Sequence, residues 1–451
     1  MALDKNYADN YIKKIKASVP PGEYSDIKKV VIAYSGGTDT SILVKILREA
    51  FGFEVVTLML DFGQEEYKGS GLEKMKQKAL SLGACKAVVK DLKADYVKDY
   101  VSKAIMANCL YEGAYVNSSA IGRYLIAEHL VKAAKEEGAQ AVVHGSTGKG
   151  NDQVRFDVSI NTLDPSLKII APVRDWGLNR DEEYIYAEAA GIPLPTKKTS
   201  PYSVDANLWG RSAECGIIEH PDCEVPQDAL AWVTPAESAP DKSAVMKLTF
   251  DGGVPVKMET GMQTITGTLE VITALNTLAG IHGVGIVDHM EDRTVGLKSR
   301  EFYEAPAATA ILTAHKDLEK YVLTKEENLF KPMIDAKFAE LAYTGLWYSP
   351  LMGAINAFVE ATQEKVTGWV KLKLYKGSCQ VLARDSPCAL YSLKLATYDK
   401  GSTYNQKDAL GFIKLWGLNT VLAAQSKKGL ASAKAGAAEA AAEGRAEIAA
   451  Q

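Results

Sequence analysis

The sequence lacks the features that mark secreted and membrane-bound proteins. None of its apolar runs is long enough to span a membrane, so we expect no membrane partner. The first residues include Asp4, Lys5 and Asp9 in place of an apolar core, which argues against a secretory signal. The same segment is too acidic for a transit peptide. We therefore expect a cytoplasmic protein.

Cysteine and histidine are scarce, and the charge has no basic excess. The 451 residues include six cysteines without C-x-x-C spacing and six histidines without metal-ligand spacing. We therefore predict neither a zinc site nor a redox pair, and we assign no metal-ligating residue. His144 follows an apolar run, where a lone histidine is more often a hydrogen-bonded structural residue than a general base. The formal net charge of -4 argues against a nucleic-acid partner.

Two familiar phosphate-binding patterns are missing from the first glycine-rich turn. Neither G-x-x-x-x-G-K-S/T nor G-x-G-x-x-G occurs there. Instead, a β-branched run leads into Ser35-Gly36-Gly37 and then into the helix-starting residues Asp39, Thr40 and Ser41. A helix N-terminus after a strand offers unpaired N–H groups to an anion, and glycines let the backbone approach closely. A capped βα turn is the alternative, but the full S-G-G-x-D-S/T string favours a phosphate loop.

A second glycine-rich turn follows the apolar residues 141–143. Residues 145–156 include Lys149, Asn151, Asp152 and Arg155. An arginine can bind a carboxylate or phosphate in a bidentate way, and the amide and carboxylate suit an amino or ureido group. The alternative is a charged surface loop. A second such loop at the carboxyl end of a strand favours a ligand site.

Alternating strand and helix patterns predict parallel βαβ units in the first half. We predict strands at 54–60, 86–90 and 168–173, and helices at 71–82 and 180–190. The turn-rich residues 110–119 are either a surface connection or a substrate contact. Residues 200–214 show little periodicity, which fits a ligand-lining loop and a solvated linker equally well.

The second half has a different pattern. Hairpins are predicted around residues 251–253 and 376–378, with long helices before residue 365, which indicates an α+β domain. The alanine-rich tail is either disordered or a helix that packs on another subunit. We predict an N-terminal extension at 1–28, domains at 29–197 and 198–425, and the tail at 426–451.

Both turns resemble signatures of the argininosuccinate synthase family, a branch of the ATP pyrophosphatase (PP-loop) superfamily. Residues 33–41 match A-Y/F-S-G-G-L-D-T-S except that Thr38 replaces leucine, and residues 145–156 match G-x-T-x-K-G-N-D-x-x-R-F. Segments 298–304 and 338–345 also match. Two further departures lie beside a substrate contact: Asp292 replaces asparagine, and Glu301-Phe302 replaces Gly-Ile.

The resemblance implies a fold and a reaction. The fold is α/β: a parallel-sheet nucleotide-binding domain, similar to adenine nucleotide alpha hydrolases, with a second α+β synthetase domain and a C-terminal helical tail. The assembly implied is a homotetramer. The reaction joins L-citrulline and L-aspartate into L-argininosuccinate, using ATP and Mg²⁺ and releasing AMP and pyrophosphate through a citrullyl-adenylate. It belongs to arginine biosynthesis or to the urea cycle.

The resemblance also implies the roles of individual residues. The ATP-binding positions are Ala33, Tyr34, Ser35, Gly36, Gly37, Thr38, Asp39, Thr40, Ser41, Leu60 and Gly145. The positions that bind citrulline or aspartate are Tyr115, Ser119, Thr147, Asn151, Asp152, Arg155, Ser203, Asp205, Ser212, Glu214, Glu291 and Tyr303. We assign Ser35, Asp39 and Asp152 to the chemistry itself.

Two other functions compete with this interpretation. A tRNA-thiolating enzyme with the same loop would need a basic face and a catalytic cysteine. A non-catalytic ATP-binding regulator would be expected to lose the cluster at 149–155, which is present.

Overall fold

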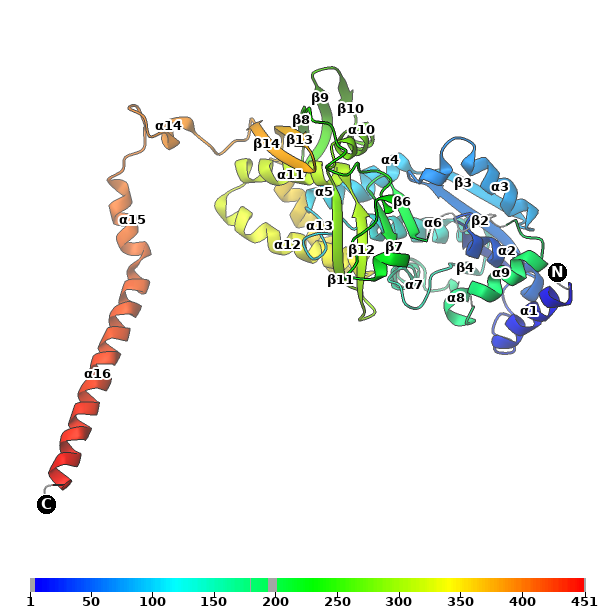
Figure 1. The fold of residues 1–451 in the computed structure, drawn as a ribbon, viewed down its shortest axis with the longest axis horizontal. Helices are drawn as coiled ribbons and strands as arrows, with labels where there is room; N and C mark the ends of the chain where they lie inside the picture. The colour runs from blue at the N-terminus through cyan, green and yellow to red at the C-terminus, as the bar shows by residue number, and fades with distance from the viewer. Residues whose placement is uncertain (1–4, 179, 194–200, 450–451) are drawn as a thin grey trace. The chain divides into compact units, whose positions relative to one another are not determined.

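The computed structural model describes residues 5–178, 180–193 and 201–449. The chain divides into two units, Met1–Leu390 and Tyr391–Gln451. Within its described residues, the first unit contains one parallel and two antiparallel sheets (Figure 1). The domain boundary predicted after residue 197 lies outside the described residues.

The parallel sheet confirms the predicted α/β fold class. It has the strand order β3-β2-β1-β4-β5. The strands are β1 (Lys29–Ala33), β2 (Glu54–Asp61), β3 (Lys86–Asp91), β4 (Ala141–Val143) and β5 (Lys168–Ile170). The order reverses between β1 and β4, so the loops after these strands diverge and leave a crevice at the carboxyl edge.

Helices cover both faces of this sheet, which explains its nearly continuous apolar strands. Val30 and Ile32 pack in one core with α2 (Thr38–Phe51), while Val31 packs on the opposite face with α6 (Ser118–Glu137). The first core also contains residues of α1, α3 and α9, and the second core residues of α4, α5 and α7. The bounds of these helices are α1 (Lys5–Ser18), α3 (Gly71–Ser81), α4 (Lys93–Tyr96), α5 (Ser102–Met106), α7 (Asp152–Leu163) and α9 (Arg180–Ala189).

The strand predicted at 168–173 is too long. It ends at Ile170, and Pro172 begins the short helix α8 (Pro172–Asp175). Proline cannot donate to the sheet, but its fixed φ suits the first turn of a helix.

The second sheet corrects the prediction of a loop or linker at 200–214. The antiparallel order is β11-β12-β7-β6, formed by β6 (Ser203–Asn207), β7 (Gly210–Glu214), β11 (Ile286–Asp292) and β12 (Lys298–Glu304). Sequence periodicity fails here because one face of these strands meets a polar cavity instead of an apolar core. Polar residues therefore occupy both faces.

The third sheet confirms both predicted hairpins. Its order is β10-β9-β8-β13-β14, with turns at 252–253 and 376–377. The strands are β8 (Ala244–Asp251), β9 (Val254–Thr260), β10 (Thr264–Thr266), β13 (Gly368–Tyr375) and β14 (Ser378–Asp385). Their apolar residues share a core with α10 (Thr268–Ile281), α11 (Pro306–Val322), α12 (Lys325–Tyr343) and α13 (Pro350–Gln363).

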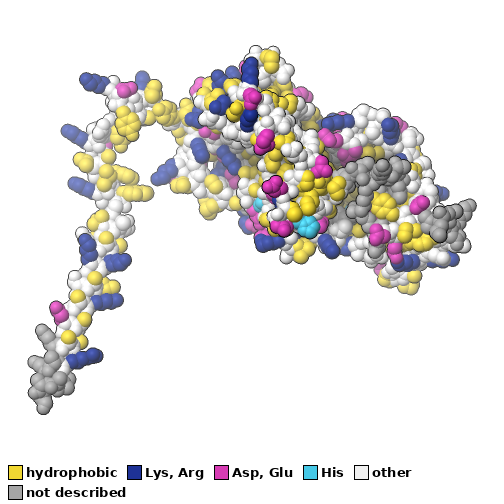
Figure 2. Space-filling view, in the orientation of Figure 1, with side chains coloured by type: hydrophobic (Ala, Val, Ile, Leu, Met, Phe, Trp, Pro, Cys, Tyr) yellow, Lys and Arg dark blue, Asp and Glu magenta, His cyan; other side chains and the backbone are white. Residues whose placement is uncertain are grey.

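The second unit is helical, with α14 (Leu393–Ala396), α15 (Asp408–Trp416) and α16 (Leu418–Ala449). The tail helix therefore begins earlier than the predicted residue 426. Large apolar side chains are exposed along α15 and the start of α16 (Figure 2). They include Leu410, Phe412, Ile413, Leu415, Trp416, Leu418, Val421 and Leu422. Across the described ranges, no helix combines the length and apolarity needed to cross a membrane.

Candidate functional site

The crevice at the carboxyl edge of the parallel sheet opens into a first cavity of about 290 Å³. Most of the predicted ATP-binding residues line it: Ala33, Tyr34, Ser35, Gly37, Thr38, Asp39, Thr40, Leu60 and Gly145. Gly36 and Ser41 do not line it. Leu58, Phe62 and Phe156 add apolar surface that the sequence did not assign.

The loop between β1 and α2 is shaped by glycine and hydroxyl groups. Gly36 has a φ of +78°, and a Cβ there would lie 2.7 Å from the Sδ atom of Met75. The Ser41 hydroxyl donates to the carbonyl of Gly37 at 2.7 Å. No side chain caps α2, so its first N–H groups lack intrahelical or capping partners and are available to an anion.

His144 lines the first cavity, and both of its ring nitrogens have hydrogen-bond partners. Its Nδ1 accepts from the Ser146 N–H at 3.3 Å, so we place the proton on Nε2, which lies 2.8 Å from Asp157 Oδ1. The ring stacks on Phe156. With both nitrogens engaged, the imidazole orients the start of the second glycine-rich turn.

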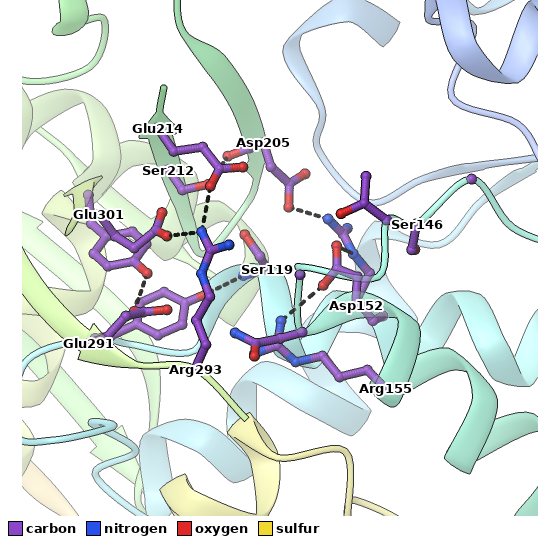
Figure 3. Close-up of a pocket in the computed structure, with 17 residues that line it drawn as sticks. Ser119, Ser146, Asp152, Arg155, Asp205, Ser212, Glu214, Glu291, Arg293 and Glu301 are labelled. Carbon is purple, nitrogen blue, oxygen red and sulfur yellow. Dashed lines mark hydrogen bonds and ion pairs between the residues drawn. The ribbon is translucent and has the colours of Figure 1, made fainter. Parts of the chain in front are cut away.

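A second cavity of about 310 Å³ lies between that turn and the β11–β12 ribbon (Figure 3). The predicted residues that line it are Tyr115, Ser119, Thr147, Asn151, Asp152, Arg155, Asp205, Ser212, Glu214, Glu291 and Tyr303. Ser203, at the exposed start of β6, lines neither cavity. The cavity is also lined by five residues that the sequence did not assign to a ligand: Arg123, Ser146, Gly150, Arg293 and Glu301.

Arg155 provides an unused donor to the second cavity. Its side chain is buried, with Nη1 donating to Asp152 Oδ1 and Nε to the carbonyl of Tyr343, both at 2.9 Å. Its Nη2 has no hydrogen-bond partner within the described residues. An unsatisfied buried donor is costly, so a ligand oxygen would stabilise it.

Tyrosine hydroxyl groups hold the carboxylate of Glu291 in place. Tyr303 donates to Glu291 Oε2 at 2.6 Å, and the Tyr343 hydroxyl donates to Oε1. The Tyr115 hydroxyl accepts from the Ser119 N–H at 2.9 Å. Burial raises the pKa of Tyr115 to about 12, so this phenol keeps its proton at neutral pH and can donate to a ligand.

The two cavities share a wall made by Arg123, Gly145, Ser146, Asp152 and Asp205. Arg123 donates from Nε to Asp152 at 2.8 Å and from Nη2 to Asp205 at 2.7 Å. Burial alone would raise the pKa of Asp152, but the guanidinium groups of Arg123 and Arg155 outweigh it and hold this pKa below its usual range. Asp152 is therefore an anion at neutral pH.

We find no protein-built metal centre in the part of the chain that the structure describes. No group of three or more His, Cys, Asp or Glu side chains there is arranged to hold an ion.

Matches to known protein families extend over most of the chain. Residues 29–193 match the family described as Arginosuccinate synthase N-terminal HUP domain, and residues 202–423 match Arginosuccinate synthase C-terminal domain. The chain is also similar to curated proteins named argininosuccinate synthase. The protein from Oceanobacillus iheyensis is 51% identical over 393 residues, or 87% of this chain and 93% of that protein. The one from Gloeobacter violaceus is 48% identical over 402 residues, or 89% and 99%.

Among solved structures, a U34-tRNA thiolase from Methanococcus maripaludis covers 44% of this chain and 68% of its own chain. It is 17% identical with a TM-score of 0.29, which is too low to bear on function.

Proposed function

The chain belongs to the argininosuccinate synthase family, and we propose that it catalyses the reaction of that family. Citrulline and aspartate are joined into argininosuccinate while ATP is cleaved to AMP and pyrophosphate. The observation that supports this most directly is the wall shared by the two cavities. It would bring the α-phosphorus of a nucleotide in the first cavity next to an amino acid in the second.

We assign the first cavity to ATP. Leu58, Leu60 and Phe156 offer apolar surface to the adenosine, and the loop from Ser35 to Ser41 offers N–H groups to the phosphates. These N–H groups stabilise the charge that builds on pyrophosphate as it leaves. Mg²⁺ usually binds through substrate phosphates with one or two carboxylates, which fits a site without a protein cage. Asp39 is the carboxylate that would hold it.

We assign the second cavity to the amino acids. Arg155 and Asn151 would orient the ureido group of citrulline, whose oxygen attacks the α-phosphorus to give citrullyl-AMP. The amine of aspartate then displaces AMP. Thr147, Asn151 and Asp152 would hold aspartate, and the low pKa of Asp152 makes it an orienting anion rather than a base. Catalysis then depends mainly on positioning and charge neutralisation.

A tRNA-thiolating activity fits the molecule less well. The net charge is -4, and no cysteine is among the residues that line the two cavities. We further propose a cytoplasmic homotetramer. The exposed apolar side chains of α15 and α16 support it, because water is an unfavourable environment for so many large apolar groups.

The test is a product assay with the purified chain, Mg²⁺, ATP, citrulline and aspartate. We expect AMP and pyrophosphate in equal amounts with argininosuccinate, and loss of argininosuccinate when either amino acid is omitted. Release of ADP, or cleavage of ATP that does not respond to citrulline, would contradict the proposal.

A further inference from the structure

Glu301 is a buried carboxylate in the wall of the second cavity that the family signatures do not require. It lies on β12, and only 6% of the residue is exposed. It comes directly before Phe302, which pairs with Ala213, so the next position of the antiparallel register places it opposite Glu214 on β7. Two like charges side by side across a sheet destabilise each other unless a cation separates them.

Arg293 is that cation, but it is shared. Its Nη2 donates to Glu214 at 2.8 Å and to Glu301 at 2.6 Å, and its Nε donates to Ser299 at 2.8 Å. Figure 3 shows the guanidinium between the two carboxylates. The single positive charge of Arg293 therefore neutralises only one of the two negative charges of Glu214 and Glu301.

A third carboxylate on the same side, Glu291, has no ion pair with any residue that the structure describes. It accepts hydrogen bonds from the neutral hydroxyls of Tyr303 and Tyr343. His289 lies opposite Glu301 in the β11–β12 register, but its Nε2 is 3.3 Å from Glu112. Across the cavity, the guanidinium groups of Arg123 and Arg155 are balanced by Asp152 and Asp205. The excess negative charge therefore lies on the side formed by the β7, β11 and β12 strands.

Burial and the neighbouring negative charge both disfavour ionisation of Glu301. Burial, and next the charge of Glu214, raise its pKa to about 7, although Arg293 opposes the shift. At neutral pH this carboxyl group therefore holds a proton part of the time. A cation that enters the cavity favours the ionised form, so the proton leaves for solvent.

We propose that Glu301 is a specificity-determining residue, which makes the second cavity select ligands that carry an α-ammonium group and releases a proton when such a ligand binds. The proposal depends on the proposed function only where it names citrulline as that ligand. A neutral ligand of the same shape would leave the excess negative charge uncompensated.

The test compares citrulline with 5-ureidopentanoic acid, which is citrulline without its α-amino group. Calorimetric titrations are run near pH 7 with α,β-methylene-ATP present, in buffers of different ionisation enthalpy that report proton release. The variant Glu301→Gln keeps the shape and a hydrogen bond to Arg293 but removes the charge. Glu301→Asp restores the charge. Asp288→Asn is the matched control, since the Asp288 side chain is 44% exposed and forms an ion pair with Arg300 on the same ribbon.

We expect the unmodified protein to bind citrulline more tightly than the des-amino compound. We also expect it to release protons when it binds citrulline but not when it binds the des-amino compound. Glu301→Gln should lose about tenfold to hundredfold of that preference, the range of one charge-assisted hydrogen bond, together with the proton release. Glu301→Asp should recover part of both, and Asp288→Asn should behave like the unmodified protein. Thermal unfolding of each variant verifies that it is folded.

Two outcomes would overturn the inference. Unchanged affinities in Glu301→Gln would show that the carboxylate does not sense the ammonium group. Equal weakening of both compounds would show that Glu301 only holds Arg293 in place. Failure of the proposed function is read separately, from the product assay. If that assay is negative, the same titrations with other α-amino acids and their des-amino counterparts still measure the preference.

Discussion

Tyr115 and Tyr303 stack with their ring centroids 4.1 Å apart. The first ring precedes α6 in the segment that matches the N-terminal family domain, and the second lies on β12 in the segment that matches the C-terminal family domain. The wall of the second cavity is therefore complete only when both halves are folded and packed together.

Replacing Gly36 with alanine should weaken ATP binding by about a hundredfold or more, because the anion needs the close backbone approach that glycine permits. The φ of +78° and the 2.7 Å approach to Met75 both disfavour a side chain at this position. Nucleotide titration of the folded variant measures the effect. Gly52→Ala is the matched control, since Gly52 has a φ of +74° but open space around it. Normal ATP affinity in Gly36→Ala would remove the phosphate-loop assignment.

Arg155→Lys should raise the KM for citrulline by about tenfold or more and leave the KM for ATP nearly unchanged. The planar fork contacts Asp152, Tyr343 and the cavity at once, and a lysine offers a single point charge. Steady-state kinetics with each substrate varied in turn decides the matter. Arg384→Lys serves as the control, since Arg384 on β14 forms an ion pair with Asp317 on α11. A selective rise in the KM for ATP would contradict the role.

The pH dependence of stability should differ between the unmodified protein and Glu301→Gln. Because the pKa of Glu301 is about 7 in the folded state and near 4.5 otherwise, the folded state binds this proton more tightly than the unfolded state. The stability of the unmodified protein should therefore fall relative to the variant as pH rises from about 4.5 to 7. At about 1.4 kcal/mol per pKa unit, the difference reaches on the order of 2–3 kcal/mol.

Urea unfolding of both proteins at several pH values between 4.5 and 8 measures that difference. Other titrating groups are common to both proteins and cancel in the comparison. Two curves that stay parallel over this range would show that Glu301 ionises normally.

Removal of residues 418–451 should convert the proposed tetramer into smaller species. Alanine favours helix, but α16 has little apolar surface of its own beyond its first turns, so we expect its stability to come from contacts with other subunits. Light scattering of the truncated chain checks this. Replacing Phe412 and Trp416 with serine tests the apolar surface without shortening the chain. A tetramer that survives both changes would show that this segment is dispensable.

Citrulline labelled with heavy oxygen in its ureido group should pass the label to AMP. In the proposed geometry the ureido oxygen attacks the α-phosphorus and leaves with it when aspartate attacks. Mass spectrometry of the products shows where the label goes. Label in pyrophosphate or in argininosuccinate would rule out the adenylate route.

The two glycine-rich turns were predictable because their signals are local. Residues 33–41 contain the strand end, the tight turn and the helix start within nine positions, and the crevice follows from the parallel strand order. The β6–β7 hairpin was not predictable, since its polar strands are specified by the pairing of β6 with β7 and of β7 with β12, and not by an apolar alternation. Arg123 lies inside α6 without any motif of its own, and only the packing of that helix brings it to the shared wall.

The position of Arg123 between the two cavities couples the binding of one substrate to the binding of the other. Its Nε and Nη2 atoms form ion pairs with Asp152 and Asp205. A phosphate bound beside it would compete with those carboxylates and so alter the wall of the neighbouring cavity. By linkage, each substrate would then change the affinity of the other by the same factor. Affinities measured for either substrate alone would therefore differ from those measured with both substrates present.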